Sequence, residues 1–311
     1  MRNPSVVESP VKLWSGLAFV IAGAVLLSAK GILSKLLYAE GLDFQEVITI
    51  RSLLSLPLFW LWAVYSAGFQ AIVRVDTKGL TASLIAGFAC YYVGGSIDFY
   101  ALTLIDAGLE RVLLYTYPTI IVLGLALLKK RWPSWQVIFS LLITYLGILL
   151  AIGAFDMALW RANAFGSFLV LICAVTYAGY FFANDIAGKR IGSAVFTVYA
   201  MSAATLALLI HFSLTHTFDE VTITPRAWSL LFIMVVFVTV VPLFLMAEGV
   251  KQIGAQRAGL VSTVGPASTI ILAAIILGEK MLWFQYLGVL ITLFGIMFVE
   301  WKQKQIGPVA D

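Results

Sequence analysis

The chain has 311 residues, of which 61% are hydrophobic and 12% are charged. The charged share is about half of that in a soluble globular protein, and a mean hydropathy of +0.99 along the whole length excludes a soluble enzyme with a single membrane anchor. The formal net charge of +4 reflects membrane topology and does not indicate binding of nucleic acid.

Runs of about 20 apolar residues are long enough to cross a bilayer as helices. The first run continues into Lys30 and a second follows soon after, so it is a retained helix and not a secretory signal. The connections between runs are short and leave no room for a soluble domain. The sequence therefore predicts an all-α polytopic membrane protein of ten transmembrane helices, at 13–37, 44–66, 79–102, 107–128, 134–154, 164–187, 193–213, 226–249, 255–277 and 281–301.

The first predicted helix carries two lysines, Lys30 and Lys35. A charge at the bilayer centre costs roughly 2.5 to 3.5 kcal/mol on insertion scales, so such residues usually face a cavity or one another. Two interpretations are open for each lysine. Its ammonium reaches the outer headgroups while its stem lies in lipid, or it points into the mouth of a cavity, where Lys30 is a candidate substrate-binding residue.

The second predicted helix carries Arg51 about two turns from its start. A guanidinium keeps its charge and has five donors to satisfy, and Glu46 is the one acid in this helix. Arg51 is therefore expected either to form an ion pair with Asp98 or Glu110, or to contact substrate.

The third predicted helix places Asp98 on the same face as Tyr91, Gly94 and Gly95. This face either lines an aqueous cavity, with Tyr91 and Asp98 contacting substrate, or packs closely through its glycines against a salt-bridged Asp98.

The fourth predicted helix begins near Glu110 and carries Arg111, Tyr115 and Pro118 on one face. Arg111 and Tyr115 are candidate substrate-binding residues. Asp98 and Glu110 are the candidates for carrying a coupling proton, although either also fits a permanent ion pair. Pro118 and its counterpart Pro266 in the ninth helix each remove one helical hydrogen bond, so we predict paired helix bends beside a central cavity.

The sixth predicted helix carries an aromatic stripe with Tyr177, Tyr180 and Phe181. Such a stripe is either packing at the membrane interface or part of a binding site, and Tyr177 and Tyr180 are candidate substrate-binding residues in the second case. His211 lies at the outer end of the seventh helix and His216 in the loop after it, where an interfacial location is expected in preference to a proton relay.

The lysines and arginines predict the orientation of the chain. With ten helices both termini lie on one side, and the opposite side holds only Arg161, Arg226 and Lys280 between its spans. The positive-inside rule then places both termini in the cytoplasm, together with the basic residues of that side: Arg2, Lys12, Arg74, Lys78, Lys129, Lys130, Arg131, Lys189, Arg190, Lys251, Arg257, Lys302 and Lys304.

The two halves of the chain resemble each other. A shift of 150 relates Gly16 to Gly166, and a shift of 148 without gaps relates six residues in the fourth and fifth helices to six in the ninth and tenth. Five spans is an odd number, so the second copy enters from the opposite side, as in inverted-repeat transporters. We predict two inverted five-helix repeats at 1–155 and 156–311. The six matched residues are Ala107, Pro118, Ala126, Trp135, Thr144 and Gly147, paired with Ala255, Pro266, Ala274, Trp283, Thr292 and Gly295.

These features resemble the EamA-like branch of the ten-helix drug/metabolite transporter superfamily. The resemblance is carried by the stretch KGILSKLLYAEGLDFQEVITIRSLLSLPLFWL and by an alanine that precedes a proline by eleven residues in each half. The chain departs from the family where Ala29, Lys30 and Gly31 stand in place of the usual Trp-Gly of the first helix. It also departs where Lys129 to Arg131 replace a common acidic helix end, which Glu279 keeps in the second half. The resemblance implies two four-helix bundles around a central cavity, with the fifth and tenth helices peripheral, and family members include exporters of amino acids.

The sequence holds no Walker A loop, H-E-x-x-H, paired-Cys motif or G-x-S-x-G elbow. We therefore expect a secondary transporter that moves an amino acid or a related anionic or zwitterionic metabolite, with export favoured, and no enzyme activity, cofactor or metal. The alternatives are a membrane receptor or structural protein, or an intramembrane hydrolase. The expected partners are the substrate, the lipid bilayer and a coupling proton, in a monomer or weak dimer in the bacterial inner membrane.

Overall fold

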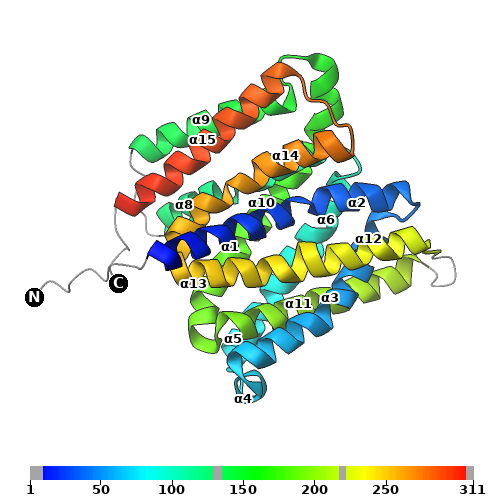
Figure 1. Cartoon of the computed structure of the whole chain (residues 1–311), viewed down its shortest axis with the longest axis vertical. Coiled ribbons are helices and arrows are strands. Elements are labelled where there is room, and N and C mark those ends of the chain that lie inside the picture. Colours follow the sequence, from blue (N-terminus) through cyan, green and yellow to red (C-terminus); the bar gives the residue numbers. More distant parts are fainter. Residues whose placement is uncertain (1–9, 129–134, 217–221, 306–311) are drawn as a thin grey trace, which may run out of the picture.

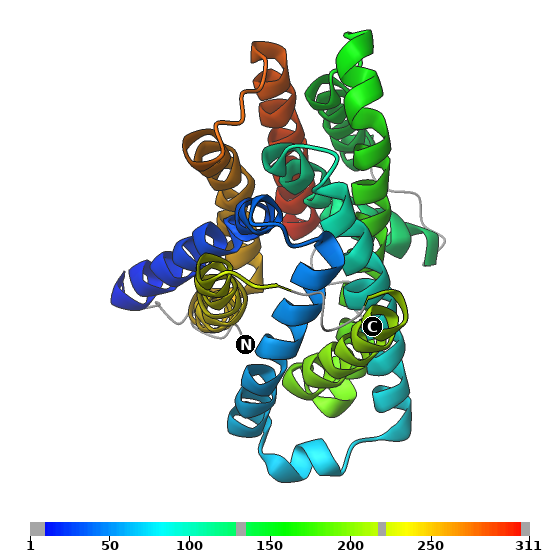
Figure 2. The same ribbon diagram turned by 90° about the vertical axis from the view of Figure 1, so that its right-hand side faces the viewer.

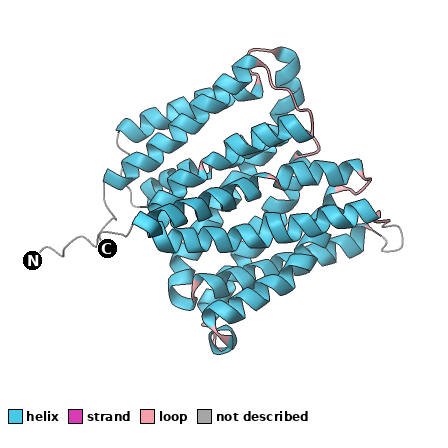
Figure 3. Cartoon of the chain, in the orientation of Figure 1, coloured by secondary structure: helices cyan, strands magenta, loops and turns pink. Residues whose placement is uncertain are grey.

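The computed structural model describes residues 10–128, 135–216 and 222–305, and this part of the chain is helical, with no strand (Figure 3). The first half contains α1 (Pro10–Ser28), α2 (Lys30–Ala39), α3 (Phe44–Ala67), α4 (Phe69–Val73), α5 (Thr77–Gly87), the π-helix η1 (Phe88–Gly94), α6 (Gly95–Ala101), α7 (Ala107–Leu114), α8 (Tyr117–Leu128) and α9 (Trp135–Ile152). The second half contains α10 (Met157–Ile191), α11 (Ser193–Thr215), α12 (Pro225–Val235), the π-helix η3 (Val236–Val240), α13 (Val241–Ser262), α14 (Val264–Ile276) and α15 (Trp283–Gln305).

The long helices run roughly side by side, and two of them form one edge of the bundle. Helices α9 and α15 lie together at this edge, and the short α4 lies at the opposite edge (Figures 1 and 2). Helix α1 begins and α15 ends at the same end of the bundle (Figure 1). We call this end the termini face, and we call the end that carries the α2–α3 turn the far face.

Six helical stretches are long and apolar enough to cross a membrane: Leu13–Ala39, Phe44–Ala67, Thr77–Ala101, Met157–Ile191, Ser193–Thr215 and Pro225–Val250. Three shorter apolar helices cover Ile138–Ile152, Val264–Ile276 and Trp283–Phe298. Large apolar side chains also cover the outside of the bundle, including Leu146, 64% exposed, and Ile275, 75% exposed. An apolar exterior of this kind fits a lipid environment, where exposure of such side chains has no hydrophobic cost.

The turn between α2 and α3 is encoded locally. Gly41 adopts a positive φ of 96°, which is favourable only without a Cβ. Asp43 then caps α3, because its carboxylate accepts hydrogen bonds from the N–H groups of Gln45 and Glu46 while Glu46 bonds back to Asp43 N–H. This box fixes where α3 begins and therefore where Arg51 lies, two turns later.

The observed helices differ from the predicted spans at three places along the chain. The predicted helix 13–37 is interrupted at Ala29, and the predicted helix 107–128 is interrupted at residues 115–116. The predicted gap between 249 and 255 is helical, and the interruption comes later, at Thr263. Proline explains the interruptions at residues 115–116 and at Thr263. It lacks an N–H and therefore fits the first turn of a helix, where the N–H groups need no partner within the helix. Pro118 and Pro266 both lie in the first turn after an interruption.

The irregular segments recur at the spacing of the sequence repeat. Shifting η1, which begins at Phe88, by 148 residues brings it to Val236, where η3 begins. The same shift moves the interruption at Tyr115 to the interruption at Thr263. Such π segments are rare and usually occur at functional sites, so their recurrence indicates that both halves share one backbone plan.

Contacts between the halves are reciprocal under the same shifts. A Cβ on Gly147 of α9 would collide with Thr292 of α15, and a Cβ on Gly295 would collide with Thr144. Likewise Gly16 lies against Ile253, while its repeat mate Gly166 lies against Ile105. Each contact maps onto the other when the residue numbers of the two halves are exchanged.

Candidate functional site

A cavity of about 400 Å³ lies among helices of both halves, within the range of small-molecule sites. Helices α1, α2, α3, α7 and α8 and the segment η1 contribute to it from the first half, and α10, α11, η3 and α13 from the second. It is lined by Leu27, Lys30, Arg51, Phe59, Tyr91, Arg111, Leu114, Tyr115, Tyr117, Tyr177, Phe181, Thr197, Met201, Val238, Thr239, Leu243, Met246 and Ser262.

The irregular backbone segments form part of the cavity wall. Tyr91 in η1 and Thr239 in η3, which are related by the 148-residue shift, both line the cavity. The breaks bring further groups to it, since Lys30 begins α2 directly after the interruption at Ala29 and Tyr115 lies at the interruption before α8. Non-helical backbone at membrane depth is tolerated where it is buried in protein or lines a cavity.

Side chains donate hydrogen bonds to backbone carbonyls around these breaks. Ser28 donates a hydrogen bond to the Gly265 carbonyl at 2.8 Å, and Thr269 donates to the Ser28 carbonyl at 3.1 Å. The Tyr115 hydroxyl donates to the Ser262 carbonyl at 3.1 Å. The broken helices of the two halves are therefore bonded to each other beside the cavity.

Lys30 is held by two carboxylates from neighbouring helices. Its ammonium forms ion pairs with Asp98 of α6 and, at 3.0 Å, with Glu110 of α7. The Asp98 and Glu110 side chains are 2% and 1% exposed, and the Lys30 side chain is 11% exposed. Lys30 thus lies between the cavity and the acids, so it does not reach the headgroups. Two buried acids share one ammonium, and each has one oxygen with no hydrogen-bond partner among the described residues.

Arg51 has no carboxylate partner in the described part of the chain. Its guanidinium lies over the Phe99 ring, 5.1 Å from the centroid, and Lys30 lies 5.7 Å from the same centroid. The buried Arg51 Nε has no hydrogen-bond partner there either. The expected ion pair of Arg51 with Asp98 or Glu110 is therefore absent from this structure, because Lys30 is bonded to both acids.

Arg111 is the second guanidinium on the cavity wall. It lies over the Tyr115 ring, 5.2 Å from the centroid, and the residue is 8% exposed. Its Nε is buried without a hydrogen-bond partner among the residues that the structure describes. An unpartnered buried guanidinium donor is costly, so Arg51 and Arg111 together indicate a site for an anion.

Aromatic rings from η1, α8 and α10 lie around the cavity that these cations line. Tyr91 contacts Tyr177 and Tyr180, with ring centroids 6.4 Å and 4.9 Å away, and Tyr117 stacks on Phe181 at 5.1 Å. Tyr180 is 6% exposed and its hydroxyl lies 3.0 Å from Thr197 Oγ1. Tyr180 therefore packs behind the wall and supports Tyr91, whereas Tyr91 and Tyr177 reach the cavity.

A second polar cluster lies at the far face. Lys35 is 3.0 Å from Glu279 and 3.7 Å from Asp106, and Glu279 also accepts hydrogen bonds from Ala107 and Gly108 N–H at the start of α7. Burial raises the pKa of the Asp106 carboxyl, and Glu279 raises it further, while Lys35 opposes both. Lys35 is thus bonded to an acid of the second half instead of extending alone toward headgroups.

Further contacts join the halves at the same face. Glu40 lies 3.2 Å from Arg226 and accepts a hydrogen bond from Thr224, and His216 lies 2.6 Å from Asp43. Together with the Lys35 cluster they link the halves on this side of the central cavity. His216 is therefore part of a contact between the two halves.

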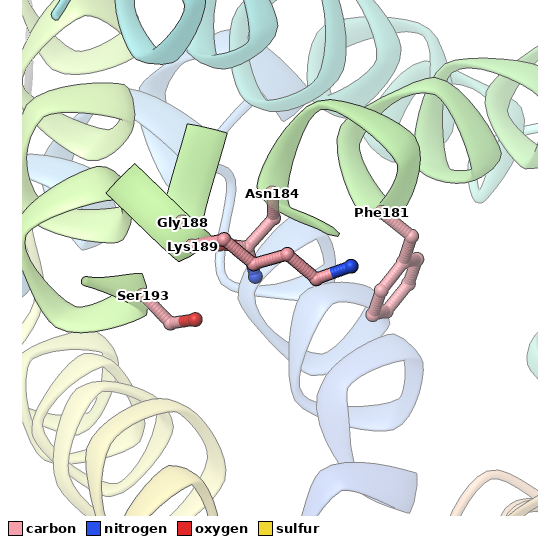
Figure 4. Close-up of a pocket in the computed structure, with 5 residues that line it drawn as sticks. All are labelled: Phe181, Asn184, Gly188, Lys189 and Ser193. Atoms are coloured by element: carbon pink, nitrogen blue, oxygen red, sulfur yellow. The ribbon is translucent and has the colours of Figure 1, made fainter. Parts of the chain in front are cut away.

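A smaller hollow lies at the other end of the bundle. It measures about 310 Å³ and is lined by Phe181, Asn184, Gly188, Lys189 and Ser193, close to the α10–α11 turn (Figure 4). Phe181 also lines the central cavity, so the two hollows share this lining residue. The smaller hollow lies on the side of the cavity opposite to the polar contacts of the far face.

Six of the predicted substrate-binding residues line the central cavity: Lys30, Arg51, Tyr91, Arg111, Tyr115 and Tyr177. Tyr180 and Asp98 lie directly behind its wall. Sequence reasoning missed Thr239, although the 148-residue shift maps Tyr91 onto it. It also missed the link between Lys35 of α2 and Glu279, an acid in the connection between α14 and α15. The described residues contain no group of three or more His, Cys, Asp or Glu that could hold a metal ion.

Comparison with known proteins gives consistent matches. The family model of the EamA-like transporter family matches residues 14–153 and again residues 164–301. The uncharacterized transporter YcbK of Bacillus subtilis (strain 168) is 31% identical over 94% of this chain and 95% of its own length. The uncharacterized transporter YetK of the same organism is 23% identical over 95% of this chain and 90% of its own length. A solved crystal structure superposes with a TM-score of 0.64 at 14% identity over 95% of this chain and 99% of the other, which shows a shared fold.

Proposed function

Because the chain belongs to the EamA-like transporter family, whose members are transporters and not enzymes, we propose that it is a secondary active transporter. It moves a small metabolite across the cytoplasmic membrane by alternating access, with export as the favoured direction. The observation that carries this proposal is the central cavity between the two halves, lined by two guanidinium groups without carboxylate partners.

The proposed architecture is ten transmembrane helices in two inverted repeats, at 1–155 and 156–311. The recurrence of the π segments and helix breaks at a shift of 148 supports it, as do the reciprocal contacts of Gly147 and Gly295. The long helices account for six spans, and the broken pair α7–α8 with α9, α14 and α15 supply the other four. Inverted repeats provide two related packings of similar energy, which alternating access requires.

The proposed orientation has both termini in the cytoplasm of a bacterial cell. In this orientation the termini face is cytoplasmic, and the polar contacts of Lys35, Glu40 and Asp43 close the outer side. The structure then corresponds to an inward-facing state. Export begins in such a state, because substrate enters the cavity from the cytoplasm and leaves after the outer contacts break.

The proposed substrate is an amino acid or a related anionic or zwitterionic compound. A guanidinium recognises a carboxylate with paired hydrogen bonds, and Arg51 and Arg111 both offer unpartnered donors. Tyr91, Tyr115 and Tyr177 provide amphipathic walls for the rest of the molecule. Asp98 and Glu110 are the candidates for coupling to a proton, since they share the single ammonium of Lys30.

Counterflow in proteoliposomes tests this function. Vesicles loaded with an unlabelled metabolite are diluted into trace labelled solute, and a transporter accumulates the label transiently. We expect counterflow for at least one carboxylate in a metabolite panel, with loss in Arg111→Gln and no loss in Arg161→Gln, which lies outside the cavity. Binding of a solute without any counterflow would instead favour a receptor.

The coupling ion is tested in the same vesicles. An imposed pH gradient is expected to drive uptake in the wild type and to lose its effect in Asp98→Asn or Glu110→Gln. Transport that is indifferent to the gradient in every variant would reject the proton and retain the carrier.

A further inference from the structure

The wall of the central cavity carries cations and no acid. Lys30, Arg51 and Arg111 line it, and none of its lining residues is Asp or Glu. The two nearby carboxylates, Asp98 and Glu110, are turned onto the Lys30 ammonium and are almost fully buried. The charged side chains that a substrate in the cavity contacts are therefore all positive.

The charges around the cavity leave a positive surplus. Asp98 and Glu110 outnumber the ammonium of Lys30 by one negative charge when all three are ionised. Arg51 and Arg111 add two positive charges, which have no carboxylate within ion-pair distance in the described chain. The surplus is one positive charge in a low-dielectric region, where an uncompensated charge is costly. One negative charge on the substrate balances it.

A zwitterion is poorly matched to this wall. Its carboxylate is attracted by the guanidinium groups, but its ammonium finds no acid and lies close to three cations. Tyrosine rings attract an ammonium weakly, and Arg111 already occupies the Tyr115 ring. Loss of hydration of the ammonium without a charged partner then opposes binding.

The rest of the wall is apolar or aromatic. Phe59, Tyr117, Tyr177, Phe181 and Met201 face the cavity, and such side chains favour a hydrophobic body. We propose that this cavity selects a small organic anion with one net negative charge and an apolar or aromatic body, a monocarboxylate, in preference to the zwitterionic amino acid of the same shape. This inference rests on the proposed function and narrows its substrate class.

The test compares three probes that share one phenylpropyl body. 3-Phenylpropionate carries one negative charge, phenylalanine adds an ammonium, and 3-phenylpropanamide is neutral. Binding to the purified wild-type protein in nanodiscs is measured by titration calorimetry. We expect phenylpropionate to bind at least about tenfold more tightly than either analogue, the factor that one charge-assisted hydrogen bond provides.

Variants assign the selectivity to the arginines. Arg51→Gln and Arg111→Gln are each expected to lose about tenfold in affinity for phenylpropionate while binding of the amide is unchanged, which also reports an intact cavity. Arg161→Gln is the matched control and is expected to bind all three probes like the wild type. The comparison among probes needs only the wild type, so a variant that does not fold leaves it intact.

The outcomes separate this inference from the proposed function. Equal or tighter binding of phenylalanine overturns the monocarboxylate assignment, and so does the absence of phenylpropionate binding, while counterflow of another solute would keep the carrier. Binding of phenylpropionate with no counterflow by any solute in the panel would support the site and overturn transport.

Discussion

The charged residues near the cavity form two sets: those with an oppositely charged partner and those without one. Lys30 is ion-paired with the buried carboxylates of Asp98 and Glu110, whereas Arg51 and Arg111 lie over aromatic rings and have no carboxylate partner in the described chain. Removing one partner of a buried ion pair leaves an uncompensated charge, which costs more than the pair contributes. Removing an unpaired cation leaves no such charge behind. We therefore expect a substitution in the first set to lower the free energy of unfolding, and a substitution in the second set to leave it unchanged or raise it.

Substitution of Lys30 tests this division. Lys30→Gln leaves two buried carboxylates without a counter-charge, so we expect a loss of about 3 kcal/mol or more in the free energy of unfolding. Arg51→Gln, the matched control, is expected to leave stability unchanged or to raise it. Thermal unfolding of the purified protein at neutral pH measures both. A Lys30→Gln protein as stable as Arg51→Gln would show that the acids do not depend on the lysine.

Whole elements are positioned by close backbone contacts between matched helices. Helices α9 and α15 run side by side (Figure 1), and their glycines allow each backbone to approach a threonine of the other. Without a hydrophobic driving force in lipid, helices associate through such tight van der Waals contacts at small residues. Helix breaks and π segments have the complementary role, because they place Lys30, Tyr91 and Thr239 at the cavity.

Alanine at three glycines tests the close contacts. Gly147→Ala and Gly295→Ala introduce a Cβ that collides with the partner helix, so we expect both to destabilise the protein by a similar amount, about 1 to 3 kcal/mol. In Gly179→Ala the Cβ meets nothing within 4 Å, and helix propensity then favours alanine by about 0.5 to 1 kcal/mol. Thermal unfolding compares the three variants. Unequal effects at 147 and 295 would contradict the reciprocity of the packing.

The whole molecule combines helix breaks and π segments that recur at a shift of 148 residues with charges that do not recur. The repeat shift of 148 maps Asp98, Glu110 and Arg111 onto Met246, Ala258 and Gly259, and the shift of 150 maps Lys30 onto Tyr180. The charged side of the cavity thus belongs to the first half, and the second half supplies apolar, aromatic and hydroxyl groups. The contacts that join the halves at the far face, such as Lys35 with Glu279, must break if the cavity is to open there.

Loss of one of these contacts is expected to shift the equilibrium between the proposed inward-facing and outward-facing states. An ion pair that is partly exposed contributes about 1 kcal/mol, so Lys35→Gln changes the ratio of states by about fivefold. A cysteine placed at Thr239 reports opening of the far face through its rate of labelling by a membrane-impermeant maleimide, applied on the side that the proposed orientation assigns to the outside. The native Cys90 and Cys173 are buried and give a low background.

The control for this experiment lies at the same turn. Lys280 is exposed and forms no ion pair in the described chain, so Lys280→Gln is expected to label like the wild type. Equal labelling of Lys35→Gln and Lys280→Gln would show that the Lys35 contact does not hold the far face closed.

The sequence by itself determined the helical class, the family and the ionisable residues that the cavity region contains. Long apolar runs form helices in a membrane, because a helix satisfies its own backbone hydrogen bonds. Helical spacing then places Arg111 and Tyr115 together on one face. Only the tertiary structure decided which charges pair. Lys30, and not Arg51, is bonded to Asp98 and Glu110, because partners on other helices are chosen by how the helices pack and break. The interruption at Ala29 and the meeting of α2, α6 and α7 have no counterpart in the periodicity of any single helix.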